Sequence, residues 1–290
     1  MNRQKFKYFI FRYGLGWLPD SIFLVLIRFT NAFRFKKSYY QLSENSFFGK
    51  INRIKGLNLE PEMMSLADKS KMSKWLKQRY DFACFVPLIG VFKDVDELIG
   101  SDLKFPCIVK MNRGSGMNLV LVSHEELMTK QVLDTIRYWF TVDSYFYSRE
   151  RHYSKMTPML VVEEFLGDNI NDYKVYCFNG VAKFIQVDID RFNGHKRAFY
   201  DLDWNLLDLG MIYPRPNSMI NQPILLNQMI EIASLISKSF EFVRVDFYVV
   251  ENKLFLGECT FFPEGGMGLF DNRAQDEWVG AMFNNKIPIA

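Results

Sequence analysis

The stretch FVRVDFYVVENKLFLGECTFFPEGG, residues 242–266, has the pattern of two β-strands joined by a tight turn. Apolar residues in its first half alternate with polar ones such as Arg244 and Asp246, as in a strand with one buried face. If 251–253 form a three-residue loop, Asp246 lies directly opposite Glu258 on the returning strand. A two-residue loop would change the parity and send the two carboxylates to opposite faces.

In the first register the two carboxylates are roughly 5 Å apart, with Arg244 beside one of them. Carboxylates this close repel one another unless a cation joins them, and oxygen ligands on one face suit Mg²⁺ shared with phosphate. The pair Asp246 and Glu258 is therefore a candidate Mg²⁺ site. A ladder of alternating charges on a solvated sheet face explains the same pattern without a ligand.

The composition indicates a globular protein with a sizeable core. The chain has 290 residues, of which 49% are hydrophobic and 16% aromatic, and this length predicts two domains. A net charge of only +3 does not indicate a nucleic-acid partner. The four cysteines and three histidines lack the spacing of metal ligands, so we expect reduced, buried thiols in a cytoplasmic protein.

The N-terminal segment is basic and aromatic. Residues 1–37 contain eight Lys or Arg residues and one acidic residue, with a break expected at 14–19. One interpretation is an amphipathic element on an anionic membrane surface, peripheral at the inner face of the membrane. The other is a helical pair packed on the body of the protein. The apolar run 21–27 is far shorter than the ~20 residues that span a bilayer, and the pattern is not that of a secretory signal.

A second informative stretch is FPCIVKMNRGSGMNLVLV, residues 105–122, which reads as a hairpin. Its loop contains Gly114 and Gly116, and glycines allow backbone N–H groups to approach phosphate oxygens closely. Lys110, at the end of the first strand, can supply a positive charge. An ordinary hairpin turn explains the glycines equally well.

A third stretch, 172–187, contains an Asn-Gly turn at 179–180, a strong hairpin signal. With a two-residue loop, Tyr176 lies opposite Lys183 and Lys174 lies opposite Ile185. The other expected elements are a helix over 60–80, a strand over 85–91, a helix from a capping box at 123 to about 140, an irregular loop over 141–158, a strand over 159–162, and helices over 223–240 and 276–283.

The charged segment after this hairpin contains His195, Lys196 and Arg197 around a glycine, and we expect a mobile loop there. One interpretation is a solvated loop, and the other is a loop that faces a substrate.

The order of these segments resembles the ATP-grasp superfamily and, within it, the TupA-like branch named for teichuronopeptide biosynthesis, over about residues 60–268. The motifs that carry the resemblance are KMNRGSGMN at 110–118, EEFL at 163–166, DYK at 172–174, the segment 188–204 and VRVD at 243–246. The resemblance implies an α+β fold, in which two α+β subdomains with mainly antiparallel sheets sandwich ATP. The expected domains are a basic N-terminal segment 1–50, an N-terminal subdomain 51–104, a lid subdomain 105–166 and a catalytic subdomain 167–290.

The resemblance also implies roles for individual residues toward ATP. Lys69 and Lys110 would hold phosphates, and Asp172 would bind the ribose. The remaining expected ATP-binding residues are Lys174, the loop residues Arg113, Gly114, Ser115 and Gly116, and the adenine-binding segment Glu163, Glu164, Phe165 and Leu166.

Asp246 and Glu258 match the Mg²⁺ ligands of the family, and Arg244 matches the cation that stabilises charge on the reacting carbonyl. Thr260 stands where many of these ligases have asparagine, and it would be a weaker ligand. The turn 263–266 also departs from the usual Pro-x-Ser-Gly-like turn of the family, so the acceptor side is less well matched.

The implied function is ATP-dependent ligation of a carboxylate to an amine through an acylphosphate. The substrates would be an amino acid and a uronic acid of a bacterial surface polysaccharide or its precursor. Lys196 and Arg197, together with His195, are candidates for binding the sugar carboxylate.

Two alternatives remain from the sequence. Asp188-Ile-Asp190 has the Asp-x-Asp form of a metal-dependent glycosyltransferase. A non-catalytic nucleotide-binding subunit is also compatible with the departures at Thr260 and Glu264.

Overall fold

A computed structural model describes residues 3–37, 39, 41–57, 60–82, 84–191 and 194–284. The chain divides into two compact units, each built from two separate stretches of sequence. Unit 1 comprises Met1–Leu18 and Leu59–Leu166, and unit 2 comprises Pro19–Asn58 and Gly167–Ala290.

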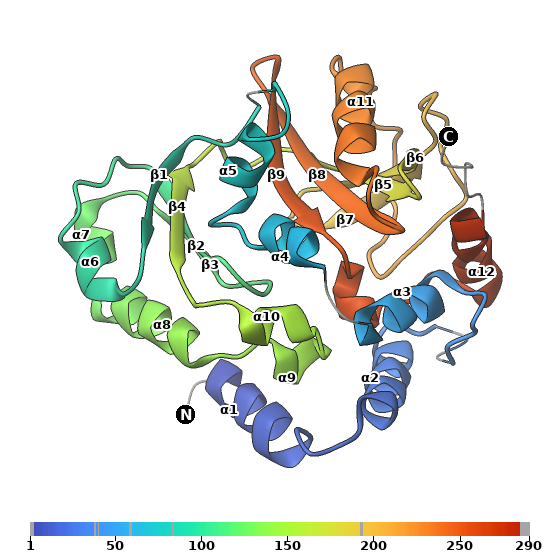
Figure 1. Ribbon diagram of the computed structural model, residues 1–290, viewed down its shortest axis with the longest axis horizontal. Coiled ribbons are helices and arrows are strands. Elements are labelled where there is room, and N and C mark those ends of the chain that lie inside the picture. Colours follow the sequence, from blue (N-terminus) through green and yellow to red (C-terminus); the bar gives the residue numbers. More distant parts are fainter. Residues whose placement is uncertain are drawn as a thin grey trace. The chain divides into compact units, whose positions relative to one another are not determined.

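Unit 1 is built on a four-stranded antiparallel sheet with the strand order β1-β4-β2-β3. Helices α6 (Val95–Ile99), α7 (His124–Leu127) and α8 (Lys130–Thr141) lie along it, as Figure 1 shows. Residues such as Val109, Ile136 and Val162 form the core between these helices and the sheet. The strands are β1 (Leu88–Phe92), β2 (Cys107–Met111), β3 (Asn118–Leu121) and β4 (Leu160–Glu164).

Local hydrogen bonds divide two of the expected helices of unit 1. The helix expected over 60–80 is interrupted between α4 (Pro61–Ala67) and α5 (Met72–Lys77), where Asp68 accepts hydrogen bonds from the backbone and hydroxyl of Ser70. Ser123 caps α7 as predicted, but Thr129 caps a separate helix, α8. Side chains that bond nearby backbone groups compete with continuous helix, so both single-helix predictions were wrong.

Other helices of unit 1 lie in segments with little apolar periodicity. The segment 141–158, predicted to be irregular, contains α9 (Tyr145–Ser148) and α10 (Arg151–Lys155). At the N-terminus, α1 (Arg3–Phe9) continues into the π-helix η1 (Ile10–Gly14). The break expected after this element is confirmed, because the next helix begins at Asp20.

Unit 2 contains a five-stranded antiparallel sheet with the order β7-β6-β5-β8-β9. Helix α11 (Leu226–Ser237) packs on β5, β6 and β8 through an apolar face that includes Met229 and Ile236 (Figure 1). The strands are β5 (Asp172–Phe178), β6 (Val181–Ile189), β7 (Lys196–Tyr200), β8 (Phe242–Val250) and β9 (Lys253–Thr260).

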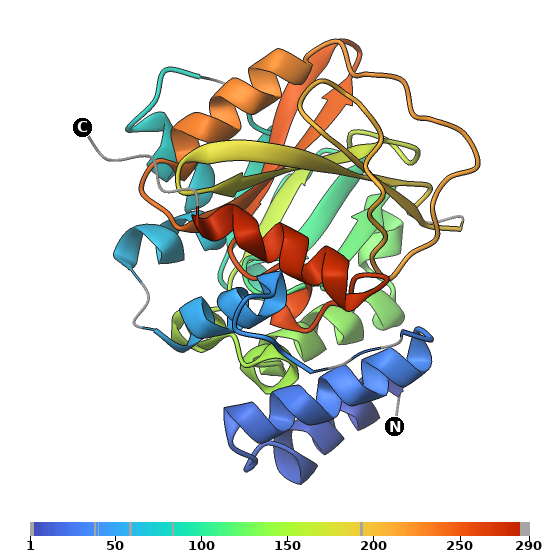
Figure 2. The same cartoon turned by 90° about the vertical axis from the view of Figure 1, so that its right-hand side faces the viewer.

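Further helices among the described residues complete the core of unit 2. Figure 2 shows α3 (Phe47–Gly56) running beside α12 (Arg273–Ala281). Phe47 is fully buried among aromatic rings of the sheet and of the C-terminal segment. The other helices are α2 (Asp20–Arg34) and two 3₁₀ helices, η2 (Pro263–Gly266) and η3 (Met282–Asn284).

The β8–β9 hairpin confirms one prediction and corrects another. Asp246 does lie opposite Glu258, but the turn has two residues, not three. Glu251 and Asn252 both have positive φ, 50° and 59°, as a tight hairpin turn requires. A β-bulge at Gly257 supplies the extra residue, which restores the parity and returns both carboxylates to one face.

The β5–β6 hairpin also contains a bulge, and here the predicted pairing was wrong. The Asn-Gly turn is present, but the register shifts between Tyr176 and Cys177. Tyr176 therefore lies opposite Phe184, and Lys174 lies opposite Gln186. This one-residue shift changes which side chains of β6 share a face with Lys174.

Candidate active site

One face of the unit 2 sheet is polar, and it is the face opposite the apolar residues that α11 covers. Strand alternation and the two bulges bring charged residues of five strands onto this face. Most of them are buried, and Asp246 and Asp172 are each only 1% exposed. Its members are Asp172, Lys174, Gln186, Asp188, Arg197, Arg244, Asp246, Glu258 and Thr260.

Asp246 lies at the centre of this face between two cations. Arg244 donates from Nε to Oδ1 at 2.7 Å and from Nη2 to Oδ2 at 2.6 Å, a bidentate pair. Lys174 donates to Asp246 Oδ2 at 2.8 Å and also to Asp172. Burial raises the pKa of Asp246, while the charges of Arg244 and Lys174 oppose this by stabilising the carboxylate.

The cations of the cluster are held in their charged forms. Burial favours loss of the proton from Arg244 and from Lys174, but neighbouring carboxylates outweigh it and raise the pKa of both groups. Among the neighbouring charges, Asp246 raises the pKa of Arg244 most, and Asp172 raises the pKa of Lys174 most. Arg191, on the segment after β6, donates to Asp172 Oδ2 at 2.7 Å.

Glu258 differs from Asp246 because 36% of its side chain is exposed. Its Oε1 lies 3.7 Å from Arg244 Nη2 and accepts a long hydrogen bond of 3.4 Å from Thr260. Arg244 Nη2 also donates to Thr260 Oγ1 at 3.2 Å.

The donors at this position suit Mg²⁺ in chemical type, since two carboxylates and a hydroxyl are hard oxygen ligands. Both oxygens of Asp246, however, accept hydrogen bonds from Arg244 and Lys174, so a metal at Asp246 must replace at least one of them. Within the described ranges, no three His, Cys, Asp or Glu side chains converge as a preformed metal cluster. The protein can therefore supply two carboxylate ligands at this position.

Arg197 forms a second charged cluster on the same face. It donates to Asp188 from Nε at 2.6 Å and from Nη2 at 3.1 Å, and from Nη1 to Glu264 at 3.0 Å. The ring of His195 stacks on Tyr213, and its Nε2 lies 3.3 Å from Asp188 Oδ1. Although burial opposes ionisation, Arg197 and His195 lower the pKa of Asp188 well below its usual range.

The charged segment around Gly194 was expected to be a mobile loop, but Lys196 and Arg197 begin strand β7, so the prediction was wrong for these two residues. Arg197 pairs with Asp188, and Lys196 pairs with Ile189, across β6 and β7. Because neighbouring residues of a strand face opposite ways, Lys196 does not share the polar face with Arg197.

The Asp-x-Asp motif is not arranged as a metal site. Asp188 is buried and bound to Arg197 through both oxygens. Asp190 is exposed beyond the end of β6 and has a positive φ of 51°. This geometry argues against the glycosyltransferase interpretation.

In unit 1, the expected phosphate-binding lysines lie near the glycine loop. Lys110 forms an ion pair of 2.5 Å with Glu163 on the neighbouring strand. Lys69, in the turn after α4, donates from Nζ to the carbonyl of Gly114 at 3.2 Å, and its backbone N–H donates to Asn112.

The loop itself has the conformation that its glycines allow. Gly114 and Gly116 have φ of 78° and 74°, and a Cβ on Gly114 would lie 2.1 Å from Ser144 Oγ. Ser115 is exposed. The guanidinium of Arg113 donates to the carbonyls of Tyr153, Met156 and Val142 at 3.1–3.2 Å, so it holds neighbouring backbone in place. Its expected contact with phosphate stays a prediction.

The expected adenine-binding segment follows the buried part of β4. Glu164 is exposed, and the backbone N–H of Phe165 donates to the carbonyl of Pro106 at 3.4 Å. Leu166 is the last residue of unit 1.

Sequence reasoning assigned no place on the polar face to Gln186, Arg191 or Glu264. Gln186 lies opposite Lys174 only because of the bulge in β5–β6, which the sequence does not mark. Arg191 lies in a charged segment without periodicity. Glu264 lies in η2, the short helix after β9, and has a positive φ of 52°. The unusual Glu-Gly-Gly at this turn was the available signal.

Comparison with known proteins agrees with the order of these segments. The model of the family described as TupA-like ATPgrasp matches residues 49–284. No match was found among curated protein sequences.

Several solved ligases are similar to the chain at low sequence identity. The D-alanine--D-alanine ligase from Bacillus anthracis complexed with ATP is 16% identical over 69% of this chain and 55% of its own length, with a TM-score of 0.38. The L-amino acid ligase from Bacillus licheniformis is 13% identical over 73% and 47%, with a TM-score of 0.43. The D-alanine-D-alanine ligase from Helicobacter pylori is 16% identical over 78% and 62%, with a TM-score of 0.43. The chain thus spans about half to three fifths of the length of these proteins.

Proposed function

The chain belongs to the TupA-like ATP-grasp family, and we propose that it joins a carboxylate to an amine through an acylphosphate made with ATP. Family membership and the two antiparallel sheets confirm the expected α+β ATP-grasp fold. ATP and Mg²⁺ are the proposed cofactors.

The observation that carries the proposal is the cross-strand pair of Asp246 and Glu258 beside Arg244 on the polar face of unit 2. The pair stands at the positions that resemble the metal ligands of the family. It also combines a buried carboxylate fixed by two cations with one that is partly exposed. Such a pair can hold a cation that is shared with a triphosphate.

The proposed reaction has two steps. A carboxylate oxygen of the first substrate attacks the γ-phosphorus of ATP, and the bond to ADP breaks. The amine then attacks the acyl carbon, inorganic phosphate leaves, and the ammonium proton is lost to solvent. Bound Mg²⁺, held by Asp246 and Glu258 with Thr260 nearby, would neutralise phosphate charge.

The chain's own residues position the reactants and stabilise charge. Lys69 and Lys110, both next to the glycine loop, would bind phosphate oxygens, which requires Lys110 to leave Glu163. Arg244 would stabilise the oxyanion that forms when the amine attacks, and a contact of this kind contributes about 3 kcal/mol. Arg244 is suited to this because Asp246 fixes its orientation.

For the substrates, we propose an amino acid as the amine donor and a uronic acid of a bacterial surface polysaccharide, or its precursor, as the carboxylate. Arg197 is the proposed carboxylate-binding residue, and Glu264, 28% exposed, is the partner that a substrate carboxylate would replace. The reaction would take place in the cytoplasm, where ATP is supplied.

The test is a screen for ADP release by the full-length protein with mixtures of amino acids and uronic acids or their nucleotide-linked forms. Turnover should require both an amine and a carboxylate. With an ¹⁸O-labelled carboxylate, one label should appear in the released phosphate, because the acylphosphate oxygen stays with phosphorus. Turnover without transfer of label would contradict the acylphosphate route.

A further inference from the structure

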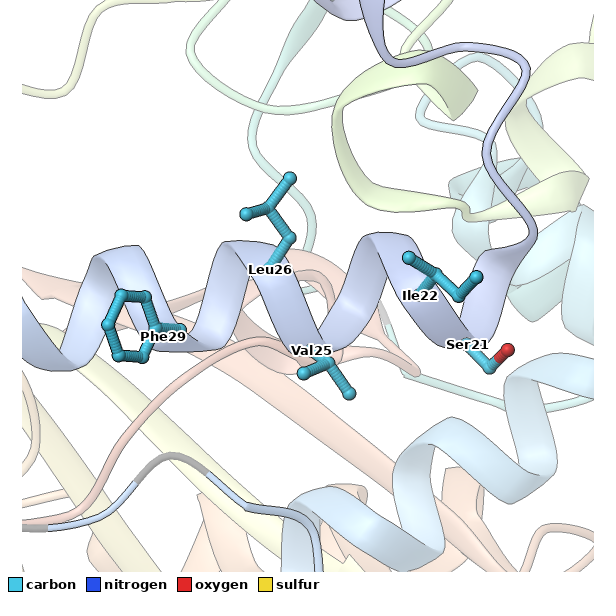
Figure 3. A pocket seen from close by; sticks show the side chains of 5 residues that line it. All are labelled: Ser21, Ile22, Val25, Leu26 and Phe29. Atoms are coloured by element: carbon cyan, nitrogen blue, oxygen red, sulfur yellow. The ribbon is translucent and has the colours of Figure 1, made fainter.

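Helix α2 presents a continuous stripe of large apolar side chains to solvent. Ile22, Val25, Leu26 and Phe29 project from its exposed side in Figure 3, and their exposed fractions are 55%, 53%, 38% and 54%. Phe33, one turn further along, is 86% exposed. Isolated exposed apolar residues are normal, but a stripe of five along one helix marks an interaction surface.

The opposite side of α2 is firmly anchored in unit 2, so this stripe is not a misplaced core face. Phe23, Leu24 and Ile27 are buried. The fully buried Arg28 donates to the carbonyl of Gly268 at 2.7 Å and lies 3.7 Å from Asp276. These contacts determine which side of the helix faces outward.

The preceding element, in unit 1, has the same pattern. In α1 and η1, Tyr8 is buried against the rings of Phe146 and Tyr147. Its neighbours are exposed, and Trp17, just after η1, is 75% exposed. The exposed apolar residues of this element are Phe6, Phe9, Ile10 and Tyr13, at 52%, 54%, 39% and 61%.

Charge identifies the kind of partner. Lys7, Arg12, Arg34 and Lys36 are exposed on these elements, and the only acidic residue in 1–37 is Asp20. Not every basic residue of the segment takes part, since Arg28 is buried and Lys37 pairs with Asp271. Aromatic and aliphatic side chains beside cations, almost without acids, fit the boundary between acyl chains and anionic headgroups. A second copy of this surface would bring like charges together.

We propose that α2 docks unit 2 on the surface of an anionic lipid bilayer, and that α1 and η1 give unit 1 a docking element of the same kind. The apolar side chains enter the boundary of headgroups and acyl chains, and the exposed cations contact lipid phosphates. The proposal places these helices along the bilayer surface. No helix in the described part of the chain is both long and apolar enough to cross a membrane.

The test is sedimentation of the full-length protein with vesicles of phosphatidylcholine alone or mixed equally with phosphatidylglycerol. We expect binding to the anionic vesicles that weakens as salt is raised. The variant Arg34→Glu/Lys36→Glu should bind roughly 20-fold more weakly or worse, since each basic residue near an anionic surface contributes about fivefold in affinity. Its matched control is Lys238→Glu/Lys253→Glu, which reverses two exposed lysines outside the proposed surface.

The apolar stripe is tested with Phe29→Ser/Phe33→Ser, which should also abolish most of the binding. Val122→Ser and Ile224→Ser replace residues of similar exposure, 66% and 75%, outside the proposed surface and should leave binding unchanged. Unchanged thermal unfolding would show that each variant is folded.

Three results would overturn the proposal. The first is equal binding to both kinds of vesicle, or to neither. The second is binding that the surface variants and their controls reduce alike. The third is concentration-dependent self-association, measured by light scattering, that the surface variants remove while lipid binding stays the same. That result would assign the surface to a second copy.

Discussion

Glu258→Gln and Asp246→Asn separate the catalytic role of the carboxylate pair from its structural role. Asp246 is 1% exposed and accepts three hydrogen bonds, two from Arg244 and one from Lys174. Removing its charge leaves two buried cations short of a partner, which typically costs about 3–5 kcal/mol. We therefore expect Asp246→Asn to lower the free energy of unfolding by about this amount.

Glu258→Gln should behave differently. Its side chain is 36% exposed and 3.7 Å from Arg244, an ion pair of the weak kind that contributes less than about 1 kcal/mol. If Glu258 binds Mg²⁺ beside the triphosphate, its substitution should lower the rate of ADP release by about 10²-fold or more. Stability and activity should thus separate at Glu258 but not at Asp246.

The assay combines urea unfolding, followed by tryptophan fluorescence, with ADP release on the substrates that the screen identifies. Thr260→Val serves as a control for the weaker ligand and should lose less activity than Glu258→Gln. Wild-type turnover by Glu258→Gln would refute the metal assignment. An Asp246→Asn variant as stable as the wild type would refute the role of the Arg244–Asp246–Lys174 cluster.

Two further predictions concern stability. Asp188→Asn should lower the free energy of unfolding at neutral pH by about 3 kcal/mol, because Arg197 loses its buried partner. The folded-state pKa of Asp188 is lowered, so its contribution to stability is fully present above the unfolded pKa of about 3.9 and is lost as the pH falls from there toward the folded-state pKa. A difference in stability between wild type and variant that persists undiminished well below pH 3.9 would contradict this prediction. Gly114→Ala should be more destabilising than Gly116→Ala by about 1–3 kcal/mol in thermal or urea unfolding. Both glycines have positive φ, but only a Cβ at 114 would meet Ser144, while nothing lies within 4 Å of a Cβ at 116. An equal loss of stability in the two variants would contradict this prediction.

The sequence was most informative where a local pattern determines local structure. The Asn-Gly turn at 179–180, the capping serine at 123 and the break before Asp20 each depend on residues close in sequence. The pairing of Asp246 with Glu258 was also predicted, although for the wrong reason. The expected loop was one residue too long, and the bulge at Gly257 compensates for it.

What could not be predicted depends on contacts between distant residues. The bulge beside Tyr176 has no turn residue to mark it, so Lys174 was paired with Ile185 and not with Gln186. Arg197 lies in a charged segment that resembles a loop, and it becomes part of a strand because Asp188 and Glu264 compensate its charge. Arg113 has no sequence signal for its three carbonyl partners, which come from segments about 30–40 residues away.

The central claim is that the chain binds ATP at its ATP-grasp motifs, and calorimetric titration of the full-length protein with Mg-ATP tests it most directly. A parallel titration with a UDP-sugar is the control. We predict saturable binding of Mg-ATP, weakened in Glu258→Gln, and no comparable binding of the UDP-sugar. Binding of the UDP-sugar without binding of ATP would contradict the account and return attention to Asp188 and Asp190.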